Sequence, residues 1–81
     1  NLDIKTKIYP NPTTNFLIVE LEKNVNAELL VYDINGKLVI KDKLNDEQKK
    51  QLDFSFLTQG NYLLHIIIAD KESVYQINKA K

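Results

Sequence analysis

Two prolines separated by one asparagine, Pro10-Asn11-Pro12, stand shortly before a continuous apolar run, Phe16 to Leu21. Each proline fixes its own φ and biases the residue before it toward extended geometry, which disfavours a helix at this point. The short polar residues that follow, Thr13 to Asn15, favour turns closed by their side chains. The segment therefore predicts a stiff turn between two strands, with Pro10, Asn11 and Pro12 as its structural residues.

Alternation of apolar and polar residues predicts strands on both sides of this turn. Ile4, Thr6 and Ile8 alternate with polar neighbours, and because Pro10 donates no ladder hydrogen bond, the first strand is expected at or near a sheet edge. The run 16–21 is apolar on both faces, which indicates a central strand. Further strands are expected over 27–32, over 62–69 as a central strand, and over 73–78 as an antiparallel return.

Glycine marks two further turns. Asn35 and Gly36 form the dipeptide that suits a type I′ turn, and they predict a hairpin that returns as a strand from residue 38. Gly60 permits a turn before the strand that starts near Tyr62.

Residues 22–26 are polar and are interpreted as a connection. Residues 42–51 are mostly charged or amide-bearing and are interpreted as a solvated crossing loop or a polar strand end.

About seven short strands, turns near every ten residues and no convincing helix predict an all-β fold. The expected architecture is an antiparallel two-sheet β-sandwich, immunoglobulin-like in its arrangement. A chain of 81 residues is expected to form a single domain. Because the start at Asn1 carries neither an initiator methionine nor a signal peptide, we expect residues 1–81 to be a fragment of a longer protein.

Composition argues against several classes of function. Eleven basic and eleven acidic residues give a formal net charge of zero, so no nucleic acid or anionic membrane partner is expected. Cysteine is absent, which excludes disulfides and thiolate metal ligands. No apolar run approaches the ~20 residues of a membrane-spanning helix, so no membrane insertion is expected.

Residues suited to catalysis are few. The sole histidine, His65, lies within an apolar run, where we expect it to be partly covered on the outer face of a sheet rather than to act as a base. One histidine without cysteine makes a transition-metal site unexpected. The acidic groups Glu20 with Glu22, and Asp42 with Asp46 and Glu47, are interpreted as solvated surface groups rather than a glycosidase pair. We therefore expect no catalytic residue, no cofactor and no metal.

Three motifs occur in a characteristic order and spacing: YPNPTTN at 9–15, VYDINGKLV at 31–39 and LTQGNYLL at 57–64. With them, the chain from Ile8 to Lys81 resembles the type A C-terminal sorting domain of Bacteroidetes proteins exported by the type IX secretion system. The sequence departs from that family at Asn15, where glycine is common, and at Ala80, where an apolar residue is usual. Asparagine also tolerates positive φ, so the turn at Asn15 is compatible with the family.

The resemblance implies a β-sandwich that is a secretion signal and not an enzyme. An N-terminal cargo domain in cis would enter the periplasm through its own signal peptide. The sorting domain would direct it across the outer membrane, and a surface sortase would then remove the domain, often attaching the cargo to anionic lipopolysaccharide. The implied partners are the translocon, shuttle and sortase proteins, and the implied location is the periplasm in transit, then the outer membrane surface or the medium.

We expect the secretion machinery to recognise the last hairpin and the C-terminal tail, where an edge strand is available for backbone pairing to a receptor. The same edge would permit self-association. The residues expected on this recognition surface are Gly60, Asn61, Tyr62, Tyr75, Ile77, Lys79 and Lys81.

A second hypothesis shares the fold but not the function. An immunoglobulin-like adhesive or carbohydrate-binding module, retained on a surface protein, would contact its ligand through exposed aromatic rings. The candidate rings are Tyr9, Phe16, Tyr32, Phe54, Phe56, Tyr62 and Tyr75.

Overall fold

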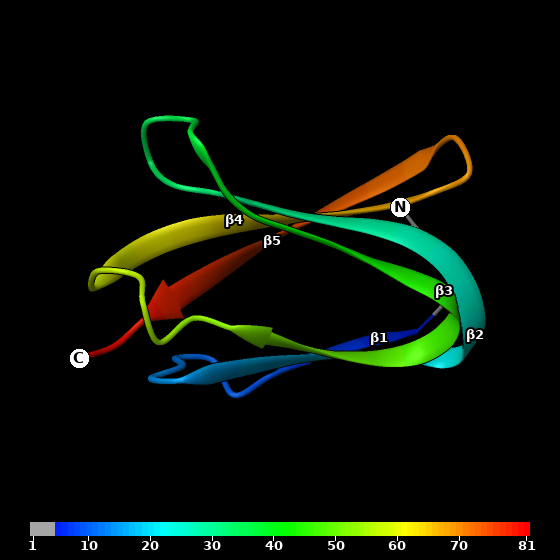
Figure 1. Cartoon of the computed structure of the whole chain (residues 1–81), viewed down its shortest axis with the longest axis horizontal. Coiled ribbons are helices and arrows are strands. Elements are labelled where there is room, and N and C mark those ends of the chain that lie inside the picture. Colours follow the sequence, from blue (N-terminus) through cyan, green and yellow to red (C-terminus); the bar gives the residue numbers. More distant parts are fainter. Residues whose placement is uncertain (1–4) are drawn as a thin grey trace.

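A computed structural model describes residues 5–81 as five antiparallel strands in one curled, half-barrel sheet (Figure 1). The strands are β1 (Thr6–Tyr9), β2 (Phe16–Tyr32), β3 (Leu38–Asp53), β4 (Gly60–Ile68) and β5 (Lys71–Lys79). Strand β2 pairs with β1, β3 and β4, and β4 pairs with β5. The expected part of Ile4 in the first strand lies outside the described residues.

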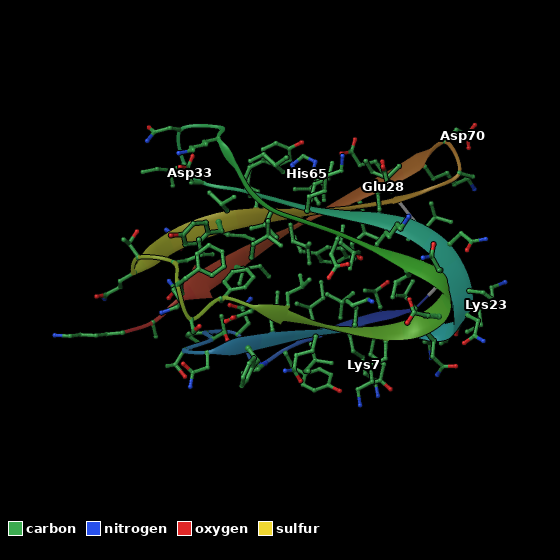
Figure 2. All side chains as sticks on the ribbon, in the orientation of Figure 1. Lys7, Lys23, Glu28, Asp33, His65 and Asp70 are labelled. Carbon is green, nitrogen blue, oxygen red and sulfur yellow. The ribbon has the colours of Figure 1, made fainter. Side chains whose placement is uncertain are left out.

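The all-β, antiparallel prediction is confirmed, whereas the two-sheet, immunoglobulin-like sandwich of about seven strands is wrong. Residues 22–26 and 42–51, interpreted as loops or strand ends, lie inside the long strands β2 and β3. These two strands pair from Phe16↔Asp53 to Glu20↔Lys49, pass through register shifts, and pair again from Ala27↔Leu44 to Tyr32↔Leu38. The sheet therefore bends within continuous strands, near Lys23, instead of breaking into two (Figure 2).

The predicted positions of three strands within the sheet are confirmed. Strand β1 lies at an edge, as expected of a strand that ends at Pro10. The first half of β2 lies between β1 and β3, and its second half lies between β3 and β4. Strand β4 has neighbours on both sides, β2 and β5. An apolar pattern on both faces therefore located the central strands correctly.

The core fills the concave side of the curled sheet. Odd-numbered residues of β2 and even-numbered residues of β4 point inward, and their side chains meet those of β3 and β5. Opposite faces of the strands carry charged residues such as Lys7, which points away from the interior (Figure 2). The buried apolar side chains are Leu17, Val19, Leu21, Ala27, Leu29, Val31, Leu44, Leu52, Phe54, Tyr62, Leu64, Ile66 and Ile77.

The hairpin between β2 and β3 forms as predicted, but its turn is not type I′. Gly36 has a φ of 82°, whereas Asn35 is not among the described residues with positive φ. The Gly36 amide donates to the Asp33 carbonyl at 3.0 Å, and the Asp33 amide donates to the Lys37 carbonyl at 2.9 Å. This is the pattern of a type I turn followed by a glycine bulge. The Asp33 carboxylate favours it, because Oδ1 accepts from the amides of Asn35 and Lys37.

Candidate recognition surface

The turns of all three sequence motifs gather at one end of the sheet, together with the C-terminus (Figure 1). Loops 10–15, 33–37 and 54–59 and residues 80–81 make up this end, which we call the motif end. Loop contacts tie it together: the Phe54 amide donates to the Asn15 carbonyl at 2.7 Å, and Gly60 pairs with Lys79. The opposite end carries the bend of β2 and β3 and the β4–β5 turn.

The double-proline loop pairs with the outer edge of β5. Asn11 Nδ2 donates to the Gln76 carbonyl at 3.0 Å, and Asn11 Oδ1 accepts from the Asn78 amide at 3.0 Å. Next along the loop, the Thr13 amide donates to the Asn78 carbonyl at 2.9 Å and the Thr13 carbonyl accepts from the Ala80 amide at 2.7 Å. The Asn11 side chain thus acts as a peptide group in a short parallel ladder. We call residues 11–13 the clasp.

Several local features fix the clasp in place. The Thr13 side chain is fully buried, and its hydroxyl donates to the Phe16 carbonyl at the start of β2. The Tyr9-Pro10 and Asn11-Pro12 peptide bonds are both cis. Pro10, Asn11 and Pro12 are themselves exposed, so they shape the loop from its outer side. The segment that the sequence marks as a turn therefore also holds the end of the last strand.

Three residues expected on the recognition surface have buried side chains. Tyr62 is 5% exposed, Ile77 is fully buried and Lys79 is 7% exposed. The Tyr62 hydroxyl donates to the Thr58 carbonyl at 2.6 Å, and its ring meets Phe54 edge-on at 5.9 Å between centroids. The Lys79 ammonium donates to the Ala80 carbonyl at 3.0 Å. In the folded domain these side chains stabilise the motif end from within.

Two of the other expected residues present their side chains to solvent. Asn61 and Lys81 are exposed, whereas Gly60 and Tyr75 are half-buried, and Tyr75 packs against the core. Asn61 Oδ1 accepts from Asn78 Nδ2 at 3.2 Å, which links β4 to the strand that the clasp holds. The structure therefore brings these residues together around the C-terminal part of β5 but divides them between surface and core.

Two exposed apolar residues lie at the motif end: Ile34, which was not predicted as a surface residue, and Phe56, which was predicted only as a candidate ring for carbohydrate binding. Ile34 is 80% exposed at the tip of the β2–β3 hairpin, and Phe56 is 64% exposed in the loop before β4. They line a shared groove of about 370 Å³, and a second groove of about 430 Å³ lies between Ile34, Tyr32 and Leu63. Ile34 and Phe56 are apolar residues in turn segments, outside any strand that could bury them. This position is the sequence signal that could have indicated an exposed apolar surface.

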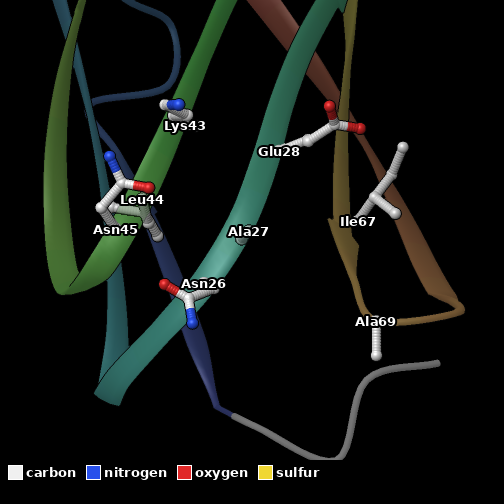
Figure 3. Close-up of a pocket in the computed structure, with 8 residues that line it drawn as sticks. All are labelled: Asn26, Ala27, Glu28, Lys43, Leu44, Asn45, Ile67 and Ala69. Atoms are coloured by element: carbon white, nitrogen blue, oxygen red, sulfur yellow. The ribbon is translucent and has the colours of Figure 1, made fainter.

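A separate pocket of about 330 Å³ lies at the opposite end of the sheet (Figure 3). Glu28 and Lys43 stand on its two sides, and Asn26 Oδ1 accepts from the Asp46 amide at 2.8 Å nearby. Among residues 5–81, no three histidine, aspartate or glutamate side chains gather as metal ligands. The full lining is Asn26, Ala27, Glu28, Lys43, Leu44, Asn45, Ile67 and Ala69.

His65 lies on the outer face of β4, as predicted, with its side chain 24% exposed. Its Nδ1 is 2.5 Å from Oε2 of Glu72 on β5, and its ring meets Tyr32 edge-on at 4.8 Å between centroids. Because His65 pairs with Val74, Glu72 is its diagonal neighbour across the two strands. The contact is therefore a cross-strand pair on the convex surface.

The acidic groups considered for catalysis make local structural contacts. The Tyr9 hydroxyl donates to Glu20 Oε1 at 2.7 Å, and this bond raises the pKa of Tyr9. The Asn45 amide donates to Glu47 Oε1, which holds the pKa of Glu47 below its usual range. Glu47 also lies 3.5 Å from the Lys50 ammonium. The pKa shifts of Tyr9 and Glu47 therefore follow from hydrogen bonds on the strand surface and in a turn.

A family model described as the secretion system C-terminal sorting domain matches residues 7–79, which include β2 to β5 entirely. No curated protein matches the chain. The described part of the chain contains no helix long and apolar enough to span a bilayer. Members of this family are signal domains for protein secretion and not enzymes. The chain therefore belongs to the C-terminal sorting domains of the type IX secretion system.

Proposed function

We propose that residues 1–81 form the single sorting domain at the C-terminus of a longer secreted protein. The domain directs an N-terminal cargo through the periplasm and across the outer membrane, and a surface sortase then removes it. The observation that carries this proposal is the convergence of the three motif turns and the C-terminus at the motif end. A receptor of the secretion machinery that binds the folded domain would find the three motifs on one compact surface there.

The surface proposed for recognition consists of the exposed side chains at the motif end. Ile34 and Phe56 supply apolar contacts, and Asn61 and Lys81 supply polar ones. Gly60, Tyr62, Tyr75, Ile77 and Lys79 support them from within or from the strand edge. The clasp keeps the tail ordered, because it binds the backbone at Asn78 and Ala80.

The arrangement also leaves room for a cargo. Strand β1 begins at the end of the sheet that carries the bend, where Thr6 pairs with Leu21. A cargo joined before β1 would thus emerge far from the C-terminal residue Lys81. The proposed partners, the translocon, shuttle and sortase proteins, would approach the motif end without obstruction by the cargo.

The aromatic residues give less support to the carbohydrate-binding alternative. Phe54 and Tyr62 are buried and pack on each other, and Tyr32 packs against His65. Tyr9, Phe16 and Phe56 are exposed at 39%, 48% and 64%. Tyr9 and Phe16 belong to the β1–β2 part of the sheet, whereas Phe56 flanks Ile34 in the groove beside the hairpin tip. Tyr9 and Phe16 are diagonal neighbours across β1 and β2, but the Tyr9 hydroxyl is bonded to Glu20 and Phe56 lines a different groove, so the three rings give no single sugar-stacking platform.

A reporter fusion tests the proposal. Residues 1–81 are placed behind a periplasmic signal peptide and a reporter, in a strain with an active type IX system. We expect reporter at the cell surface or in the medium, separated from the domain. The double variant Ile34→Ser with Phe56→Ser should leave the reporter in the periplasm, while Asn24→Ser, at the exposed bend, should not. Periplasmic retention of the unmodified fusion would contradict the proposal.

A further inference from the structure

The backbone at the end of β5 is held on both sides as far as Ala80. Gly60 pairs with Lys79 on the β4 side, and the clasp binds both backbone groups of Asn78 on the other side. The Ala80 amide then donates to the Thr13 carbonyl at 2.7 Å. The Ala80 carbonyl, the next polar group along the chain, accepts from a side chain instead, because the Lys79 ammonium lies 3.0 Å from it. Lys79 therefore extends the bonding of the tail by one hydrogen bond.

Lysine is an unusual residue for this position. Lys79 is 7% exposed and points to the same side of β5 as Ile77, which is fully buried. An ammonium has three donor hydrogens, and among residues 5–81 no carboxylate lies within ion-pair distance of Lys79. Because it costs free energy to bury a charge without an opposite charge, an apolar side chain would suit the core better here. The group that explains the lysine is the one that it binds, the Ala80 carbonyl.

A bond to the Ala80 carbonyl fixes the direction in which the chain leaves the sheet. That carbonyl belongs to the planar peptide group between Ala80 and Lys81, so its orientation sets the plane from which Lys81 projects. The Lys81 side chain is exposed, and within the described part of the chain its ammonium forms no ion pair. Of the two lysines in the tail, Lys81 is thus the one that presents its charge to a partner.

We propose that Lys79 is a positioning residue for recognition. It orients the peptide group between Ala80 and Lys81 so that the Lys81 ammonium meets a carboxylate on a component of the secretion machinery. The inference rests on the sorting function proposed above and names the chemistry of one of its contacts. It differs from recognition of a basic tail through both lysines, which the burial of Lys79 disfavours.

Lys79→Met separates positioning from stability. Methionine keeps an unbranched apolar side chain but removes the ammonium, so the urea midpoint of the purified 81-residue chain should stay unchanged or rise. In the reporter fusion the exported fraction should nevertheless fall by about tenfold, as expected when a bond to a charged group is lost. Lys79→Arg retains a cationic donor and should export better than Lys79→Met. Lys23→Met, at the exposed bend, is the matched control and should export normally.

A double-mutant cycle tests whether Lys79 acts through Lys81. Lys81→Gln alone should also lower the exported fraction by about tenfold. Adding it to Lys79→Met should lower export little further, because the Lys81 ammonium is already misplaced in that background. Lys81→Arg keeps the charge and should export normally. NMR of the purified chain measures the ordering itself: the heteronuclear NOE of the Lys81 amide should fall in Lys79→Met and be retained in Lys81→Gln.

The outcomes separate this inference from the sorting function. Normal export of Lys79→Met would overturn the inference and leave the sorting function intact. The same holds if the loss of export in Lys79→Met parallels a loss of stability, or if it multiplies with the loss from Lys81→Gln. Equal losses for Lys81→Arg and Lys81→Gln would overturn the contact with a carboxylate. Failure of the unmodified fusion to export would overturn both the inference and the sorting function.

Discussion

The side-chain amide of Asn11 holds the backbone of Asn78, 67 residues further along the chain, with Oδ1 3.0 Å from the amide nitrogen. This contact makes the first motif and the last strand one structural unit. The tail of the domain is ordered because the turn before β2 supplies it with donors and acceptors at Asn11 and Thr13. A change in the double-proline loop is therefore expected to act on the far end of the sequence.

Replacing Asn11 by alanine should destabilise the domain by about 1–2 kcal/mol, since two hydrogen bonds to β5 are lost. Urea unfolding of the 81-residue chain measures this. Amide exchange should accelerate at Asn78 and Ala80 more than at Leu64 in the core. Asn11→Asp retains the acceptor for Asn78 but not the donor to Gln76, so its loss should be smaller. Uniform acceleration of exchange, including at Leu64, would contradict a local role for the clasp.

The strands that alternate or are continuously apolar could be predicted from the sequence, because burial imposes a pattern on them. Strand β4 and the first half of β2 are examples. Residues 22–26 and 42–51 could not, since strand pairing uses backbone groups and is compatible with charged side chains on a solvated bend. The prediction of separate sheets followed directly from interpreting these segments as loops.

The candidate site was predictable to a similar degree. Asn11 and Gly60 belong to sequence motifs, and the structure places both beside the C-terminal part of β5, but motif membership does not distinguish a surface residue from a supporting one. Tyr62 and Ile77 are buried, which depends on the curl of the whole sheet. The Asn11–Asn78 contact joins residues too far apart in the sequence for local patterns to reveal it.

Gly36→Ala should lower stability by about 1–2 kcal/mol, because a φ of 82° is strained for a residue with a Cβ atom. Nothing lies within 4 Å of the position that a Cβ would occupy, so the cost comes from the backbone and not from a clash. Gly36→Asn should cost less, since asparagine tolerates this region. Urea midpoints of the two variants provide the comparison. Equal losses for both would indicate that the left-handed conformation does not set the cost.

Replacing Ala69 by glycine should raise the stability of the domain, whereas replacing Gly36 by alanine should lower it. Ala69 lies between β4 and β5 with a φ of 56°, which is unfavourable for alanine. Ala69→Gly removes that strain and should stabilise the domain by up to ~1 kcal/mol, despite the greater freedom of glycine in the unfolded chain. A rise in the thermal midpoint is the expected observation. Ala69→Val, which adds a β-branch at the same φ, should lower the midpoint, and a gain with valine would argue against this explanation.

Tyr62→Phe should cost about 0.5–1.5 kcal/mol, the usual contribution of one buried hydrogen bond. The main bond lost is the one from the Tyr62 hydroxyl to the Thr58 carbonyl at 2.6 Å, in the loop that leads to β4, and a longer contact with the Thr58 hydroxyl at 3.2 Å is lost with it. Tyr9→Phe removes the hydroxyl bond to Glu20 on the exposed outer face and should cost less. Urea unfolding of both variants tests the ranking, and a larger loss for Tyr9→Phe would reverse the assignment of Tyr62 to a structural role.

Stability should depend on the charge of Asp53 at acid pH. Bonds from the Ser55 hydroxyl, at 2.5 Å, and from the Ser55 amide, at 2.9 Å, hold the pKa of Asp53 below its ordinary value of 3.8. Since the folded pKa is lower than the unfolded one, the stabilisation is present in full above about pH 5 and is lost as the pH falls through the folded value.

The expected result is a stability gap between the wild-type chain and Asp53→Ala that is constant from about pH 7 to pH 5 and closes below about pH 4. Urea unfolding across this range measures the gap, and a carboxyl NMR titration follows Asp53 itself. Ser55→Ala removes the hydroxyl donor, the largest cause of the shift, and should move the Asp53 pKa back toward its ordinary value. A gap that persists undiminished at the lowest pH would show that Asp53 acts through packing or turn geometry and not through its charge.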